Sequence, residues 1–421
     1  MRNFFFIGTI GFISILSLST RADHSHEGSV AMSELTEEAE RNNLELKQAQ
    51  ENLQALQFKK SSLRGAFTPQ LSVDGSVQNA QFDDERNKAT SLYGKAEWNL
   101  YNGGADQIAY ELQNNEILIQ EKRLRSLKSK TKAEVSKIYY ELQFILESLS
   151  LKERALQLNA QQMKIAKSKN SSGFTTNSDV LEFDLRESTL KSDLILLNQQ
   201  LEKKSRELDV ILSRPSQNQS LAVRGHLTRD LSSFDRNELL KKIQNQNEQI
   251  LKSQQEVQEA EYEWQQARSQ FLPKLNLEGR YGRLASEEKG FKENNNFFVI
   301  LKMSWNLFSG FKDSYATKSA NSKRIAQQLD LQQKNIALTA ELDSILAEIK
   351  ALNIRLDLEE KNLERSEKYY KLTLDEYRRG VKNSPDMVGA SERLLETRIR
   401  NLEYRRDLML AKAKVQEMIG E

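Results

Sequence analysis

Apolar residues recur at helical spacing along two long stretches of the chain that contain no proline. Between residues 104 and 168 they stand seven apart, as in the a and d seam of a coiled coil. This seam consists of Val135, Leu142, Leu149, Leu156 and Met163, with Ile138 and Ile145 at companion positions. A helix of about 65 residues rises ~1.5 Å per residue and is near ~100 Å long. The pattern therefore predicts a rod or the wall of a tube.

A strict two-residue alternation follows Pro69 and Pro273. It predicts β-hairpins over residues 68–101 and 272–308, each strand about ten residues long with one apolar and one polar face, as in a transmembrane β-barrel. Ile300 is an exception, because it stands on the polar side. A soluble sheet packed on helices would alternate in the same way. The narrow helical seams leave no broad face to cover a sheet, so we favour the membrane interpretation.

The chain is an internal duplication. Phe67-Thr68-Pro69-Gln70-Leu71 matches Phe271-Leu272-Pro273-Lys274-Leu275 at an offset of 204, and Trp98-Asn99-Leu100-Tyr101 matches Trp305-Asn306-Leu307-Phe308 at 207. The seam returns as Leu342, Ile349, Leu356, Leu363 and Tyr370. Each repeat, 36–212 and 236–418, is predicted to run helix, strand, strand, long helix, turn, helix. Residues 213–235 form a connector outside the helical tube, with a short strand expected at Leu221–Val223.

Four strands cannot close a barrel, and a bilayer does not tolerate an open sheet edge. Two copies would give eight strands with a filled interior, whereas three would give twelve and leave room for a lumen. The predicted lumen residues carry mixed charge: Lys95, Glu97, Glu278, Arg280 and Lys302. Each hairpin ends in aromatic residues, which we expect at the level of a membrane–water interface. They are Trp98, Tyr101, Trp305 and Phe308.

The amino-acid composition argues against several classes of function. Lys plus Arg (62) nearly balances Asp plus Glu (60), which argues against a nucleic-acid binder. A mean hydropathy of −0.67, with no long apolar run, argues against a helical membrane protein. Cys is absent and His occurs only three times, so we expect no metal site and no cofactor.

The N-terminus has the pattern of a secretory signal peptide over residues 1–22: a basic tip, an apolar stretch and a small-residue exit. An uncleaved anchor is the alternative, although the stretch is short for a membrane span. Residues 23–35 follow as a leader, in which His24 and His26 either capture metal weakly or belong to a solvated terminus, the interpretation that we favour.

The turns after the long helices, 170–178 and 379–385, carry helix-capping signals. Gly173 and Gly380 suit the left-handed position after a helix. Asn177 and Ser384 are expected as N-caps, with Pro385 as the first helical residue. Asp179 and Asp386 then fall in the first turn, where the helix dipole favours a carboxylate and where ordinary capping would account for both.

With its duplicated helix–strand–strand–helix halves, its Phe-x-Pro-x-Leu strand entries and its Trp-Asn-Leu-Tyr-Asn-Gly-Gly exit, the sequence resembles the TolC-type outer-membrane efflux protein family over roughly residues 33–418. The resemblance implies a mainly α fold with transmembrane β: a homotrimer with a 12-stranded outer-membrane β-barrel on a long periplasmic α-helical coiled-coil barrel. It also implies a passive exit duct of a tripartite efflux or type I secretion system, for small molecules, metal ions or proteins. The implied partners are outer-membrane lipid, a periplasmic adaptor and an inner-membrane pump of the RND, ABC or MFS type.

The resemblance also implies a gate at the tip turns, with Tyr377 and Lys382 at positions where the family has Tyr and Arg. Three copies of Asp386 near a threefold axis would form an acidic ring, with Asp179 as the weaker candidate. Lys cannot make the planar, bidentate contacts of Arg, and Gly389 stands where a second Asp often follows, so we expect a looser and less acidic gate.

Two other classes of function were weighed. A secreted coiled-coil scaffold or adaptor without a barrel would lack the two duplicated amphipathic hairpins. An enzyme would need a phosphate loop, a metal cluster or a nucleophile elbow, and the sequence has none of these motifs.

Overall fold

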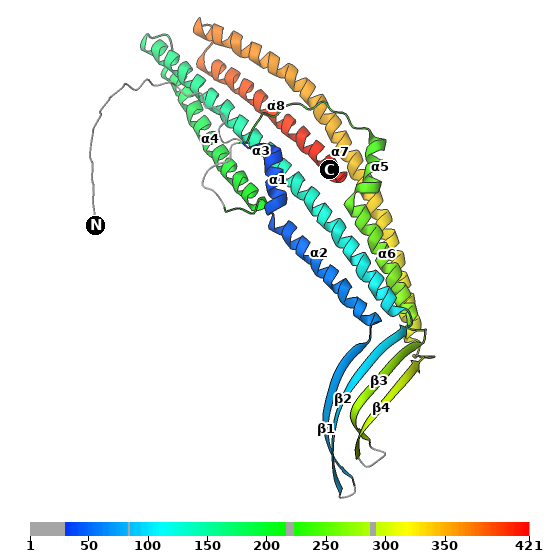
Figure 1. The fold of residues 1–421 in the computed structure, drawn as a ribbon. Helices are drawn as coiled ribbons and strands as arrows, with labels where there is room; N and C mark the ends of the chain where they lie inside the picture. Colours follow the sequence, from blue (N-terminus) through cyan, green and yellow to red (C-terminus); the bar gives the residue numbers. More distant parts are fainter. Residues whose placement is uncertain (1–29, 83–84, 216–222, 287–291, 421) are drawn as a thin grey trace, which may run out of the picture.

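The structure is a computed structural model that describes residues 30–82, 85–215, 223–286 and 292–420. The predicted signal peptide, most of the leader, and both His24 and His26 lie outside these residues. Figure 1 shows an elongated molecule with the sheet at one end and long helices running away from it. Helices α3 (Ala105–Ser171) and α7 (Lys312–Arg378) each have 67 residues, which gives them a length of about 100 Å.

Each long helix forms a hairpin with a shorter one at the end far from the sheet. Helix α4 (Asn177–Ile211) returns along α3, and α8 (Ser384–Met418) returns along α7. The predicted seams hold these hairpins together. Val135, Leu142 and Leu149 are buried in one core, and Leu342, Ile349 and Leu356 are buried in another.

The first helix of each repeat is broken in two, although the sequence predicts a single helix. The pieces are α1 (Met32–Asn42) and α2 (Leu44–Leu63) in the first repeat, and α5 (Arg236–Gln246) and α6 (Glu248–Ser269) in the second. The break falls at Asn43 and Asn247, whose ψ angles of 121° and 124° are not helical. A short 3-10 turn, η1 (Arg64–Phe67), follows α2.

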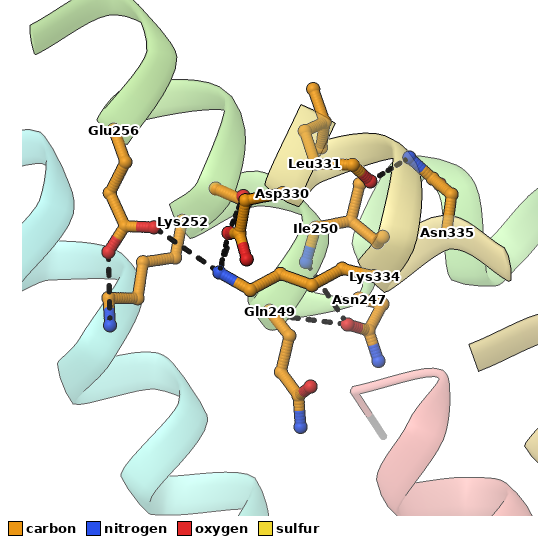
Figure 2. A network of polar contacts seen from close by, with 10 residues as sticks. Asn247, Gln249, Ile250, Lys252, Glu256, Asp330, Leu331, Lys334 and Asn335 are labelled. Carbon is orange, nitrogen blue, oxygen red and sulfur yellow. Dashed lines mark hydrogen bonds and ion pairs between the residues drawn. The ribbon is translucent and has the colours of Figure 1, made fainter. Parts of the chain in front are cut away.

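Both breaks are held by a distant helix end. Asn43 Nδ2 donates to the carbonyl of Ile211 at the end of α4, and Asn247 Nδ2 donates to the carbonyl of Met418 at the end of α8, each at 2.8 Å. The Asn247 Oδ1 atom accepts from the backbone N–H groups of Gln249 and Ile250, which caps α6 (Figure 2). A polar side chain thus satisfies the end of one helix and the start of another.

Farther along α6, an ion-pair network fixes this helix to α7. Lys334 reaches from α7 to Glu256 at 3.4 Å and also pairs with Asp330 at 2.7 Å. Lys252 of α6 contacts the same Glu256 at 3.2 Å (Figure 2). Helix α6 therefore continues the tube wall along α7 after its break.

The sheet is antiparallel with the order β1-β2-β3-β4. Its strands are β1 (Gln70–Phe82), β2 (Glu85–Asn102), β3 (Lys274–Ser286) and β4 (Lys292–Ser304). They are longer than predicted at their far ends. However, β4 ends at Ser304, so Trp305 and Phe308, which were expected to continue it, lie beyond the strand.

The connector packs across the outside of the helices. Val223 makes an isolated parallel bridge with Val30, while Leu221 of the expected strand lies outside the described residues. Tyr139 of α3 donates a short hydrogen bond to the carbonyl of Arg224. The ammonium of Lys412 on α8, which is 5% exposed, lies 2.9 Å from the Asp230 carboxylate.

A helix crossing a bilayer needs a long apolar stretch. Within the described ranges, no helix has such a stretch.

Candidate functional site

The two tip turns have the same backbone design. Gly173 and Gly380 have φ angles of 74° and 82° and follow α3 and α7, as predicted. The N–H of the residue after each glycine bonds to a carbonyl inside the helix, Phe174 to Lys169 and Val381 to Glu376, both at 2.9 Å. This is the Schellman arrangement, which favours glycine because a left-handed residue with a Cβ is strained.

The predicted N-caps are one residue too late. Thr176 and Asn383 are the N-caps of α4 and α8, whereas Asn177 and Ser384 are the first helical residues and Pro385 is the second. Asn383 Oδ1 accepts from the N–H of Asp386 at 3.0 Å. Both caps have extended backbone angles, so their side chains can reach back over the first turn.

The two acids of the first turns make different contacts. Each carboxylate receives the backbone N–H of its own cap, Asp179 from Thr176 at 3.1 Å and Asp386 from Asn383 at 3.4 Å. Asp179 also accepts, through Oδ1, from the N–H of Ser384 in the other turn at 3.2 Å. Asp386 instead lies 3.9 Å from Lys382 within its own turn. Asp179 is therefore the acid that joins the two repeats.

These hydrogen bonds act on the ionisation of Asp179. Partial burial works toward a higher pKa, but the hydrogen bonds from Thr176 and Ser384 outweigh it and hold the pKa of Asp179 below its usual value. The link to Ser384 is thus made by a charged acceptor across the physiological pH range.

Tyr377 is buried beneath the tip, with 1% of its surface exposed. It packs edge-on against Phe183 of α4 and its hydroxyl lies 3.5 Å from that of Ser384. Lys169 of α3 donates to the backbone carbonyl of Tyr377 and stands 4.4 Å from the centre of its ring. Tyr377 therefore belongs to the core shared by the two hairpins.

Sequence reasoning missed Lys169 and two further polar contacts between the repeats. Gln162 donates to the hydroxyl of Tyr370 at 3.1 Å, and Arg186 pairs with Glu392 at 2.7 Å. All three contacts join residues more than 200 positions apart, and no local pattern marks them.

At the other end of the molecule, the charged residues predicted for a lumen share one face of the sheet. Lys95 is directly opposite Arg280, and Glu97 is opposite Glu278, which in turn is opposite Ile300. Lys302 is two residues farther along the same face of β4. Lys95 pairs with Glu97 and Arg280 with Glu278, so charges of both signs meet side by side.

The opposite face of the sheet is apolar and exposed. Val73 on β1, Leu92 on β2 and Leu301 on β4 are 76%, 62% and 63% exposed. Aliphatic side chains of this size are rarely left in water as a continuous patch. This face therefore needs an apolar surrounding.

The aromatic residues predicted for the membrane–water interface make contacts within their own repeats. Trp98 donates its ring N–H to the carbonyl of Phe67 at 3.2 Å, and Trp305 donates to that of Phe271 at 3.0 Å. The Phe-x-Pro entry and the Trp exit thus meet in both repeats. A register shift between Asn99 and Tyr101 turns Tyr101 onto the same face as Trp98. Phe308 packs edge-on against Phe311.

Over the part of the chain that the structure describes, no group of three or more His, Cys, Asp or Glu side chains is placed to hold a metal ion. The described histidine, His226, is 81% exposed at its side chain and lies 3.7 Å from Glu147.

The comparisons with known proteins agree with this architecture. A family model described as outer membrane efflux protein matches residues 35–214 and 239–421, which is most of the chain and both repeats. The chain belongs to the outer membrane efflux protein family. A search of curated proteins finds no match to the sequence.

Solved structures with the same fold include outer-membrane channels. The Campylobacter jejuni CmeC outer membrane channel superposes with a TM-score of 0.81 at 14% identity, covering 96% of this chain and 90% of that one. The outer membrane protein VceC from Vibrio cholerae superposes with a TM-score of 0.81 at 16% identity, covering 92% of this chain and 96% of that one. The open state of the Neisseria gonorrhoeae MtrE outer membrane channel gives a TM-score of 0.80 at 16% identity, covering 92% of this chain and 88% of that one.

Family membership confirms the predicted resemblance, the mainly helical, duplicated fold class and the location in the outer membrane. It also confirms the predicted function class, an outer-membrane efflux channel, and the scaffold alternative is not favoured. The family consists of channel proteins and not of enzymes.

Proposed function

We propose that three copies of this outer membrane efflux protein form a closed, passive conduit. Its twelve strands surround a lumen in the outer membrane, and its helices form a tunnel that extends into the periplasm. The observation that carries this proposal is that each chain has two open sides, and that these sides are related by the internal duplication.

The internal junction between the two repeats is the template for the junction between copies. Within the chain, α3 of the first repeat contacts α6 and α8 of the second. The equivalent contact for α7 would be with α2 and α4, but those helices lie on the opposite edge of the chain (Figure 1). A second copy supplies the missing helices, and the same head-to-tail contact repeated around an axis closes a ring.

The residues at the open edges fit this role. Glu248 and Ser129 are 6% and 8% exposed and line the same cavity at the internal junction. Their equivalents at offsets of 204 and 207 are Leu44 and Ile336, which are 66% and 71% exposed. Apolar side chains at positions that are buried in the other repeat support an interface there. Other exposed apolar residues of α4 and α7 are Leu181, Leu185, Ile195, Ile325, Leu329, Ile354 and Leu358.

The four-stranded sheet indicates how many copies of the chain assemble. Strands β1 and β4 are the two edges of a four-stranded sheet, and a bilayer requires both to be paired. Eight strands would enclose only side chains, while twelve leave space for water and cargo. The charges that line this lumen, Lys95, Glu97, Glu278, Arg280 and Lys302, pair with one another or alternate in sign, so we expect weak ion selectivity.

At the far end, the tip turns form the periplasmic gate. Asp179, Tyr377 and Lys169 hold the two hairpins of one chain together, and three copies of Asp386 contribute an acidic ring. A periplasmic adaptor and an inner-membrane pump of the RND, ABC or MFS type supply the cargo and the energy, and the cargo passes without chemical change.

A disulfide between copies tests the assembly. Leu44→Cys and Ile336→Cys in one chain, which has no native cysteine, place one thiol on each open edge. Complete oxidation in isolated outer membranes is expected to give a covalent trimer on a denaturing gel. The matched control is Leu44→Cys with Ile354→Cys, whose second thiol lies about 27 Å farther along α7 and should not cross-link.

Two outcomes would contradict the proposal. Chains that remain monomeric would show that the open edges do not meet, and a covalent dimer as the largest product would replace three copies by two. The cross-linked trimer should also conduct in planar bilayers, and a closed barrel without conductance would contradict the conduit.

A further inference from the structure

A cavity of about 270 Å³ lies where α6 begins and α8 ends, against α3 and α7. Its floor is buried and is formed by Ser129, Asn247, Glu248, Leu338 and Met418. Its charged rim is formed by Lys130, Glu341, Lys414 and Glu417. The lining is therefore mainly polar and charged, with a small apolar wall formed by Leu338 and Met418.

Glu248 is the unusual group in this floor. Glu248 is only 6% exposed. Its Oε1 atom is buried and has no hydrogen-bond partner among the described residues. The neighbouring Asn247 donates from Nδ2 to the carbonyl of Met418 and accepts through Oδ1 from the N–H groups of Gln249 and Ile250. A buried carboxylate oxygen without a donor is costly, so this atom calls for a ligand that donates.

Neither lysine of the cavity rim forms an ion pair with Glu248. Of the two rim lysines, Lys414 pairs with Glu341 at 2.7 Å and Lys130 lies 3.7 Å from Glu134 outside the cavity. The lining groups comprise three carboxylates and two ammonium groups, a formal balance of one negative charge. One monovalent cation would neutralise it.

We propose that this cavity binds a small organic cation through a primary ammonium group, with the Glu248 carboxylate as its acceptor. The hydroxyl groups of Ser126 and Ser129 are further acceptors beside it. Leu338 and Met418 cover the apolar part of the ligand. An ammonium fits better than a metal ion, because among the described residues no group of three carboxylate or imidazole side chains, the three lining carboxylates included, is placed to hold a metal ion.

The site lies at the junction between the two repeats. Its walls come from both repeats, so an occupant would tie the start of α6 and the end of α8 to α3. The equivalent of Glu248 in the first repeat is Leu44, so the duplication provides this carboxylate once per chain.

The affinity should depend on pH because the carboxylate must be ionised. Burial raises the pKa of Glu248 to about 7, although Arg125 and Lys122 of α3 work in the opposite direction. The other charged groups that face it are Lys130 of α3, Glu341 of α7, and Lys414 and Glu417 of α8. An alkylammonium keeps its charge in this range, so binding should strengthen from about pH 6 to about pH 8.

Calorimetric titration of the detergent-solubilised, full-length protein with pentylamine tests the proposal. We expect saturable binding of one molecule per chain, weakened at least about ten-fold by Glu248→Gln, which removes a charge-assisted hydrogen bond. The matched control is Glu259→Gln, since Glu259 is a half-buried acid on the same helix but outside the cavity. It should bind pentylamine like the natural protein.

A second comparison needs no variant. The natural protein should bind pentylamine but not 1-pentanol, which has the same shape and no charge. Absence of saturable binding, equal affinity for amine and alcohol, or unchanged affinity in Glu248→Gln would each overturn the proposal. None of these measurements uses conductance, so the conduit can be confirmed or rejected separately.

Discussion

The Asp179 carboxylate accepts a hydrogen bond from the backbone N–H of Ser384 at 3.2 Å, across the gap between the two tip turns. The two residues are 205 positions apart and belong to different repeats. The equivalent acid, Asp386, makes no such crossing contact with the residues that the structure describes and pairs with Lys382 instead. The duplicated tips are thus alike in backbone and different in the contacts that their acids make.

This asymmetry predicts different effects for the two acids. Asp179→Ala removes a capping carboxylate and the link to Ser384 in the other repeat, whereas Asp386→Ala removes a capping carboxylate and an ion pair with Lys382 inside its own turn. A hydrogen bond to a charged group contributes about 1.5 kcal/mol, so Asp179→Ala should raise the open probability of the channel by up to about ten-fold. Single-channel recording in planar bilayers measures this. If Asp386→Ala raised the open probability more than Asp179→Ala, the link from Asp179 to Ser384 would not be the contact that keeps the tip closed.

Asp386 is expected to act on cations. If three copies surround the axis, Asp386→Asn removes three negative charges from the narrowest point and should weaken block by divalent cations at least several-fold. The blocking concentration is read from single-channel current. Asp343→Asn is the control, because this acid is paired with Arg236 far from the tips and its loss should leave block unchanged. If divalent cations blocked the natural protein, Asp386→Asn and Asp343→Asn equally, Asp386 would not be part of the gate.

The facing of the sheet predicts opposite results at two adjacent residues. Leu301 is opposite Leu277 on the apolar face, whereas Ile300 is opposite Glu278 on the polar face. A lysine facing lipid costs about 2–4 kcal/mol per chain at mid-bilayer depth, so Leu301→Lys should impair assembly of heat-resistant trimers. Ile300→Lys should assemble normally beside Glu278. Gel mobility of unheated samples distinguishes them, and normal trimers from Leu301→Lys would reverse the assigned facing.

The ion pair between Asp230 of the connector and Lys412 of α8 predicts that the stability of the protein depends on pH. The ammonium of Lys412 and the N–H of Ser232 bond to Asp230 and lower its pKa to about 2. A carboxyl whose pKa is depressed on folding stabilises the protein above its unfolded value, near 4, and loses this effect as the pH falls toward 2. Asp230→Asn should therefore lower the free energy of unfolding at pH 7 by about 1 kcal/mol, after discounting for a side chain that is 41% exposed.

Thermal unfolding followed by circular dichroism measures this difference at several pH values. The difference between Asp230→Asn and the natural protein should shrink below about pH 4, where the natural carboxyl becomes protonated. A difference that stays constant down to about pH 2 would mean that the amide disturbs packing and not charge.

Short-range patterns in the sequence predict most of the architecture. The seven-residue spacing of Val135, Leu142 and Leu149 predicted the long helices, and the alternation after Pro69 and Pro273 predicted the hairpins. Gly173 and Gly380 located the tip turns. Such features are readable because helix, strand and turn preferences depend on neighbours within a few residues.

The duplication, the two amphipathic faces of the sheet and the order of the elements can all be read from the sequence, since each is a local periodicity or a repeated motif. The tertiary structure alone decided the helix breaks at Asn43 and Asn247, because the carbonyls that hold them lie 168 and 171 residues away. It likewise decided that Asp179, and not Asp386, reaches across the tip. Contacts of this kind depend on which chain segments pack side by side, and no spacing along one segment records that.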